Sequence, residues 1–174
     1  CYKSALACDP LSAFGGIVSC NFRINKKLAL ELNKLFLEVI IGNNFDTDAL
    51  KILRRKKNLR LIDASNFNSN NAQRFLSVNK NILIQSEDNK VFTKKDFKVV
   101  SKKKPSKSQF DDLIFAFNAC RYVKSNAIVL VSNKSTIGIG SGQPSRLDSC
   151  KIAIDKMKKF LKPLPDSVAA SDAF

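Results

Sequence analysis

The 174-residue sequence contains no histidine, and none of its five cysteines forms a C-x-x-C pair. Zinc sites and histidine-based catalytic triads depend on these residues, so we expect neither a metal site nor a histidine base in this chain. The odd number and irregular spacing of the cysteines are typical of reduced, mostly buried thiols in a cytoplasmic protein. The sequence also lacks the roughly 20-residue apolar run of a membrane span and the apolar stretch of a signal peptide.

Acidic residues are scarce as well: 30 Lys and Arg stand against 15 Asp and Glu, a formal net charge of +15. This balance suits anionic partners such as nucleotides, polyglutamylated cofactors or nucleic acid. The basic residues lie in short scattered runs, however, which are typical of solvated surfaces. No basic stretch is interleaved with aromatic residues in the way that single-strand binders need. A nucleic-acid-binding module is therefore an alternative, not the preferred interpretation.

The first third of the chain alternates between short apolar strands and amphipathic helices. We predict strands at residues 17–20, 39–41 and 58–62, separated by a helix at 26–36 that Asn25 can cap and by a second helix that begins after Asp46. This order predicts an α/β fold with a largely parallel sheet.

The middle and the end of the chain are less regular. We expect a surface loop at residues 63–80, a β-hairpin of 82–85 with 90–93, a strand at 99–100 and a linker at 102–105. Helices follow at about 108–123 and 145–161, and the segment 167–174 is extended. Strand–helix units on both sides of residues 63–105 suggest two related lobes.

The most distinctive stretch is 124–146. An apolar strand, a turn at Asn133-Lys134 and a second short strand lead into three alternating glycines, Gly138, Gly140 and Gly142, before a helix that begins at Ser145. A glycine-rich backbone that leads into a helix N-terminus can hold an anion, and Arg146 adds a full charge. The alternative is an ordinary corner whose glycines only relieve steric crowding. The G-x-G-x-G pattern, without a second βαβ half, argues against a dinucleotide fold.

Three side chains near these loops could contact a ligand. The Asn126 carboxamide can donate and accept hydrogen bonds, the Arg146 fork suits a phosphate or carboxylate, and Phe174 could stack on a planar heterocycle. Each also has a simpler interpretation, as a turn residue, a surface charge and a core residue respectively. Reasoning from residues alone therefore ends at a nucleotide-sized anionic ligand.

Four stretches also carry a family resemblance: CDPLSAFGG (8–16), EVIIGNNFDTDALKILRRKKNLRLI (38–62), KSNAIVLVSNKSTIGIGSGQPSR (124–146) and ASDAF (170–174). In their sequence, order and spacing they resemble the transformylase part of the family of bifunctional aminoimidazolecarboxamide ribonucleotide (AICAR) transformylases and inosine monophosphate (IMP) cyclohydrolases. The resemblance extends over essentially the whole chain.

The resemblance implies a cytoplasmic, homodimeric enzyme of purine biosynthesis that moves a formyl group from 10-formyltetrahydrofolate to AICAR. It implies cytidine-deaminase-like lobes without zinc, the first ending in residues 1–104 and the second beginning in residues 105–174. The positions implied near AICAR are Gly15, Asn126, Arg146 and Phe174. Those implied near the folate are Glu38 and Leu147. The parent protein would also carry IMP cyclohydrolase activity, and a non-catalytic structural or dimerisation lobe is the second alternative.

The family's catalytic Lys-His pair lies upstream of the CDPLSAFGG motif, and we expect this chain to be an internal piece that begins after it. We therefore predict that the 174-residue chain has no transformylase activity of its own. Incubation of the purified chain with AICAR and 10-formyltetrahydrofolate should give no formyl-AICAR beyond the uncatalysed background. Turnover well above that background would contradict the prediction.

Overall fold

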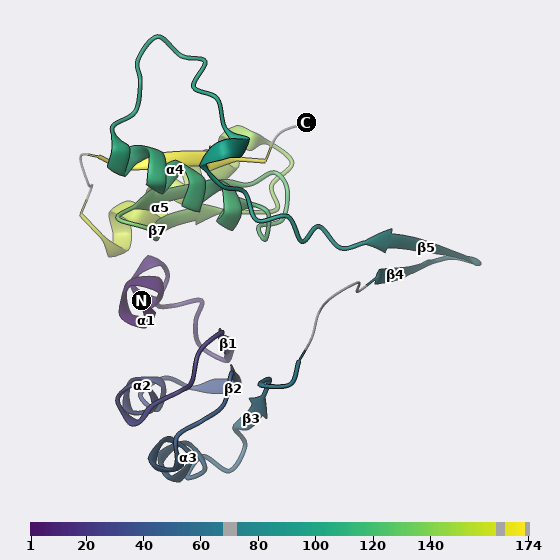
Figure 1. The fold of residues 1–174 in the computed structure, drawn as a ribbon, viewed down its shortest axis with the longest axis vertical. Coiled ribbons are helices and arrows are strands. Elements are labelled where there is room, and N and C mark those ends of the chain that lie inside the picture. The colour runs from purple at the N-terminus through teal and green to yellow at the C-terminus, as the bar shows by residue number, and fades with distance from the viewer. Residues whose placement is uncertain (68–72, 163–165, 173–174) are drawn as a thin grey trace. The chain divides into compact units, whose positions relative to one another are not determined.

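A computed structural model describes residues 1–67, 73–162 and 166–172 (Figure 1). The chain divides into two compact units: one is Phe14–Lys90, and the other combines Cys1–Ala13 with Val91–Phe174. Among the described residues, no helix is both long and apolar enough to cross a membrane. The lobe boundary between residues 104 and 105 stays a prediction.

The unit Phe14–Lys90 begins with alternating strands and helices. Its elements are β1 (Gly16–Cys20), α2 (Lys26–Leu32), β2 (Leu37–Gly42), α3 (Thr47–Leu53) and β3 (Arg60–Asp63). The strands form a parallel sheet in the order β1-β2-β3, and α2 packs on α3. Ile24, Leu32, Ile40 and Leu53 are fully buried. The predicted α/β alternation is confirmed in this unit.

Local hydrogen bonds explain where α2 begins and ends. Asn25 accepts the Leu28 backbone N–H at 2.9 Å, as expected of an N-cap. The prediction that the helix continues to residue 36 was wrong, because tighter turns replace it after Leu32: the Leu35 N–H donates to the Leu32 carbonyl at 3.3 Å. The helical spacing of apolar residues extends beyond the end of α2 because the residues that follow lead into the strand β2.

The same unit contains a two-stranded antiparallel hairpin of β4 (Gln73–Val78) and β5 (Asn81–Ser86). The prediction that residues 82–85 form a strand is confirmed, but its predicted partner at 90–93 is wrong. The partner lies upstream, within residues 73–78, which we had predicted as loop. The turn falls at Asn79, whose φ of 54° is one that asparagine tolerates, instead of at the acidic residues 87–88.

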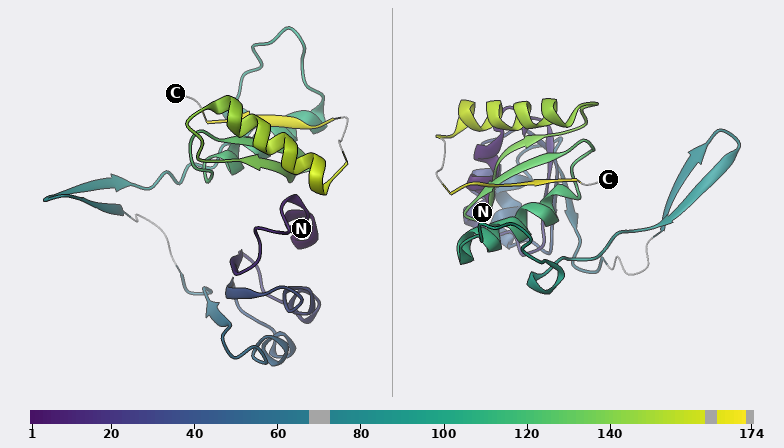
Figure 2. Two further views of the ribbon diagram at one scale, coloured as in Figure 1. Left: turned by 180° about the vertical axis from the view of Figure 1, so that it is seen from behind. Right: turned by 90° about the horizontal axis from the view of Figure 1, so that it is seen from above.

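The second unit contains α1 (Tyr2–Cys8), a short 3₁₀ turn η1 (Lys94–Asp96), α4 (Lys107–Cys120), β6 (Ile128–Ser132), β7 (Ser135–Gly140), α5 (Arg146–Phe160) and β8 (Val168–Ser171). The sheet order is β7-β6-β8, and both neighbours run antiparallel to β6. Helices α4 and α5 cover opposite faces of this sheet (Figure 2), and α1 packs on β7. The protein is therefore a mixed α/β fold, parallel in the sheet β1-β2-β3 and antiparallel in the hairpin β4–β5 and in the sheet β7-β6-β8. Residues 99–100 form no strand.

A tight turn joins β6 to β7 at Asn133 and Lys134, as the sequence predicted. Their φ angles of 51° and 53° are typical of a hairpin turn whose twist matches the strands. The buried carboxylate of Asp112 on α4 accepts both backbone N–H groups, at 2.8 Å and 2.7 Å. Helix α4 is thereby fixed to the turn by hydrogen bonds as well as by apolar packing.

The two glycines inside β7 face α5 at very short range. A Cβ atom on Gly138 would lie 2.2 Å from the Ala153 carbonyl oxygen, and one on Gly140 would lie 1.8 Å from the Ser149 carbonyl oxygen. Any side chain there would force the helix away from the sheet. Of the two interpretations of this glycine pattern, the structure supports relief of steric crowding for Gly138 and Gly140.

The close approach of α5 to β7 makes Gly140 sensitive to substitution. Gly140→Ala should lower the free energy of unfolding by about 2 kcal/mol or more, as expected of an overpacked core, in urea denaturation followed by circular dichroism. Ser135→Ala, at the other end of the same strand, is the matched control and should change it by less than about 0.5 kcal/mol. Equal stability of the two variants would show that α5 is not held at this distance.

Candidate functional site

Two of the sequence candidates, Asn126 and Arg146, join further polar side chains in the Arg146 cluster, which we define as Asn126, Arg146, Ser171 and Asp172. Arg146 is the first residue of α5, Asn126 precedes β6, and Ser171 and Asp172 lie at the end of β8. The antiparallel pairing of β6 with β8 places Ser171 opposite Ile128. The start of one strand and the end of the other therefore meet beside the helix N-terminus.

Arg146 connects these segments through its two terminal nitrogens. Nη2 donates to Asn126 Oδ1 at 2.9 Å. Nη1 donates to Asp172 Oδ1 at 2.5 Å, to the Asp172 carbonyl at 2.6 Å and to Ser171 Oγ at 2.5 Å. The ion pair is partly shielded, with 30% of the Arg146 and 22% of the Asp172 side chain exposed. Such charge-assisted hydrogen bonds are among the strongest side-chain contacts in proteins.

Asn126 holds the loop that enters α5. Its Nδ2 donates to the backbone carbonyls of Gln143 and Pro144, at 2.9 Å and 2.8 Å. The backbone carbonyl of Asn126 accepts the Ser149 hydroxyl at 2.6 Å. Both amide hydrogens are thus used within the protein. The side chain fixes the loop 141–145 against the start of β6.

The Asp172 carboxylate is stabilised in its charged form. Hydrogen bonds from the Ser125 side chain and the Ala127 backbone N–H, together with Arg146, lower the pKa of Asp172 to about 2. The Ala127 N–H lies 2.8 Å from Asp172 Oδ1. The cluster therefore combines one permanent cation with one permanent anion at neutral pH.

The structure brings together some of the predicted site residues but not all of them. Asn126 and Arg146 are in direct contact, and Leu147 is the next residue, with 74% of its surface exposed. Gly15 and Glu38 belong to the other unit. Gly15 has a φ of 71°. Glu38 is exposed on β2, and its Oε2 lies 3.9 Å from Arg60 Nη1. Phe174 lies outside the described residues.

The sequence alone did not reveal the ion pair that Asp172 makes with Arg146. The signal was an acidic residue directly after an apolar strand and an arginine at the start of a helix. These two residues are 26 positions apart, and only the strand pairing brings them together.

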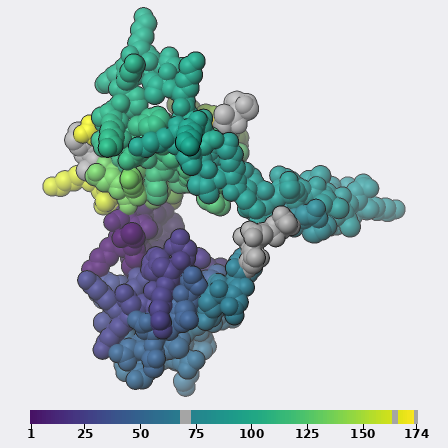
Figure 3. All heavy atoms as spheres, in the orientation of Figure 1, coloured from purple at the N-terminus to yellow at the C-terminus, as the bar shows by residue number. Residues whose placement is uncertain are grey.

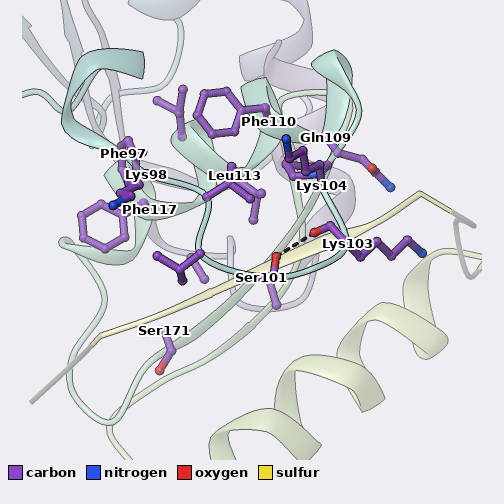
Figure 4. A pocket seen from close by; sticks show the side chains of 16 residues that line it. Phe97, Lys98, Ser101, Lys103, Lys104, Gln109, Phe110, Leu113, Phe117 and Ser171 are labelled. Atoms are coloured by element: carbon purple, nitrogen blue, oxygen red, sulfur yellow. Dashed lines mark hydrogen bonds between the residues drawn. The ribbon is translucent and has the colours of Figure 1, made fainter.

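The described part of the chain contains no group of three or more His, Cys, Asp or Glu residues that could hold a metal ion. A cavity of about 670 Å³ lies elsewhere in the second unit, between residues 97–105, α4 and the edge strand β8 (Figure 4). Its walls are mainly apolar, with Phe97, Phe110 and Phe117 among them. It shares only Ser171 with the Arg146 cluster, so we place the candidate site at the cluster.

Fold and cluster together define a mixed α/β protein whose polar corner is built from two strand ends and one helix start. Residues 1–156 match the family model described as AICARFT/IMPCHase bienzyme, and the chain belongs to this family.

Relatives with the name bifunctional purine biosynthesis protein PurH match 99% of this chain. The proteins of Parvibaculum lavamentivorans and Rhodospirillum rubrum are both 43% identical to it, and that of Aquifex aeolicus is 44% identical. The chain covers 34%, 35% and 33% of these three proteins respectively, or about a third of their length. The resemblance to this enzyme family is thus confirmed.

The lowered pKa of Asp172 predicts a pH dependence of stability. Because the folded-state pKa is about 2, below the ordinary 3.8, this carboxylate stabilises the fold above pH 4 and stops doing so as the pH falls towards 2. Asp172→Asn should lower the unfolding free energy at pH 7 and flatten its decrease between about pH 4 and pH 2. Asp155→Asn, at an exposed position on α5, is the control and should retain the wild-type slope. Identical pH profiles for Asp172→Asn and wild type would rule out a stabilising ion pair.

Proposed function

We propose that this chain is part of a folate-dependent formyltransferase that transfers the formyl group of 10-formyltetrahydrofolate to the amine of AICAR. The observation that carries the proposal is the contact between Asn126 and Arg146, at 2.9 Å, in a chain that belongs to the AICARFT/IMPCHase family. The rest of the parent protein would supply the IMP cyclohydrolase activity, and the enzyme would act as a cytoplasmic homodimer.

The charge balance of the Arg146 cluster suggests which part of AICAR it would contact. Asp172 neutralises Arg146 at close range, so the pair offers little net attraction to a phosphate. A neutral polar group such as a carboxamide, which both donates and accepts, suits a corner that combines a carboxamide, a hydroxyl and a neutralised ion pair. We therefore assign the AICAR base, not its phosphate, to this corner. Gly15 and Phe174 are also proposed as AICAR contacts.

The folate contacts are proposed at Leu147 and Glu38. Leu147 exposes 74% of its surface directly beside Arg146, which suits contact with a planar heterocycle. Glu38 is an exposed carboxylate, 56% accessible, that could accept N–H groups of a pterin ring.

The contribution of this chain would be positioning, not proton transfer. Formyl transfer needs a group that removes the amine proton and a donor that stabilises the oxyanion. The chain contains no histidine to remove the proton. Holding the amine close to the formyl carbon still accelerates such a reaction through orientation.

A second candidate is a structural lobe without a ligand. One observation favours it: both amide hydrogens of Asn126 are used by the protein's own carbonyls, and Arg146 is paired with Asp172. In that case the cluster would serve only to fix the loop and the strand ends.

Calorimetric titration with AICAR separates the two candidates. The formyltransferase proposal predicts saturable binding by the wild-type chain and at least about tenfold weaker binding by Asn126→Ala, which equals a loss of about 1.4 kcal/mol. Lys158→Ala, at an exposed position on the same helix α5, should bind like wild type. Ribose 5-phosphate should not bind the corner. Absence of AICAR binding by a folded wild-type chain would favour the structural lobe.

A further inference from the structure

Asp172 is the acidic side chain of the Arg146 cluster, and several donors hold its carboxylate in place. Its Oδ1 accepts Arg146 Nη1 at 2.5 Å and the Ala127 backbone N–H at 2.8 Å. A hydrogen bond from the Ser125 side chain also favours the charged form. Because most of the Asp172 side chain is shielded from solvent, its charge is screened weakly. A permanent negative charge is therefore fixed beside the guanidinium.

The guanidinium of Arg146 is held from two directions. Its Nη1 donates to three acceptors at the end of β8, and Asp172 supplies two of them, the carboxylate and the backbone carbonyl. Its Nη2 donates to Asn126 Oδ1, before β6. Hydrogen bonds at both terminal nitrogens fix the plane of a guanidinium as well as its position. The orientation of Arg146 and its effective charge therefore both depend on Asp172.

Without Asp172, the surroundings of this corner would favour an anion. Arg146 is a full cation in the first turn of the 15-residue helix α5, where the helix dipole also attracts negative charge. The whole chain carries a net charge of +15. The segment 97–105, which projects from the second unit in teal at the top of Figure 3, adds lysine side chains to the wall of the cavity that shares Ser171 with the cluster. All these charges attract a carboxylate, and Asp172 opposes them at the closest range.

We propose that Asp172 is a specificity-determining residue, through which the Arg146 cluster selects a neutral carboxamide and rejects a carboxylate at the same position of the imidazole. The inference rests on the proposed function, since AICAR carries that carboxamide. Asp172 cancels the attraction of Arg146 for a carboxylate and adds a like charge that repels one, which is how sites discriminate between ligands of similar shape. A carboxamide is not repelled, and its N–H groups can donate to carboxylate oxygens, each of which accepts more than one hydrogen bond.

Calorimetric titration with two ligands that differ only in this group tests the role of Asp172. The ligands are AICAR and the analogue in which a carboxylate replaces the carboxamide. Both carry the same ribose phosphate, so its contacts cancel in the ratio of the two dissociation constants. We expect the wild-type chain to bind AICAR at least about tenfold more tightly than the analogue, and Asp172→Asn to lower this preference at least about tenfold or to reverse it. Asp172→Glu, which restores the charge, should keep the preference.

Asp111→Asn is the matched control, because it removes a paired carboxylate from the same unit. Asp111 pairs with Lys94 at 2.7 Å and with Lys134 at 3.5 Å. Lys134 lies in the turn that follows β6, whereas Asn126 precedes this strand, so the control acts at the other end of the sheet. It changes the net charge by the same amount as Asp172→Asn and should leave the ratio of the two dissociation constants unchanged.

The outcomes separate this inference from the proposed function. A wild-type chain that is folded by circular dichroism but does not bind AICAR contradicts the formyltransferase proposal, and this inference with it. Binding of AICAR with the same preference in wild type and in folded Asp172→Asn overturns the role of Asp172 alone. The wild-type ratio decides even if Asp172→Asn does not fold: tighter binding of AICAR supports the inference, and equal or tighter binding of the carboxylate analogue overturns it.

Discussion

The ion pair between Arg146 and Asp172 holds together the end of the sheet at which the candidate site lies. Arg146 begins α5, Asp172 follows β8, and the same carboxylate accepts the N–H of Ala127 at the start of β6. A single partly shielded pair thus joins three segments that are distant in sequence. Because burying either charge alone is costly, the two residues are stable at this corner only together.

This pair depends in turn on how closely α5 approaches the sheet. Gly138 and Gly140 permit this approach, because no side chain at either position would fit between β7 and α5. Asn126 fixes the loop that leads into α5. The glycines act at a distance from any ligand: they set the helix position, and the helix position sets where the Arg146 guanidinium lies. Their chemical contribution to the site is therefore indirect.

The sequence predicted those features that depend on neighbouring residues. The alternation of strands and helices at residues 16–63, the cap at Asn25 and the turn at Asn133 all follow from local patterns. The antiparallel pairing of β6 with β8 did not, since these strands have the same local pattern whether they pair parallel or antiparallel. The predicted hairpin paired β5 with the segment after it, not with β4 before it, because the acidic segment after residue 86 resembles a turn more than Asn79-Lys80 does. The ion pair and the hydrogen bond of Asp172 were not predicted because these contacts span 26 and 45 residues.

A crystal structure of the chain with AICAR tests most directly whether the Arg146 cluster positions the substrate. The expected result is the AICAR base within hydrogen-bonding distance of Asn126 or Arg146, with the pair between Arg146 and Asp172 intact and the phosphate directed away from it. AICAR bound at another surface, with the Arg146 cluster free of ligand, would contradict the assignment of this corner to substrate binding.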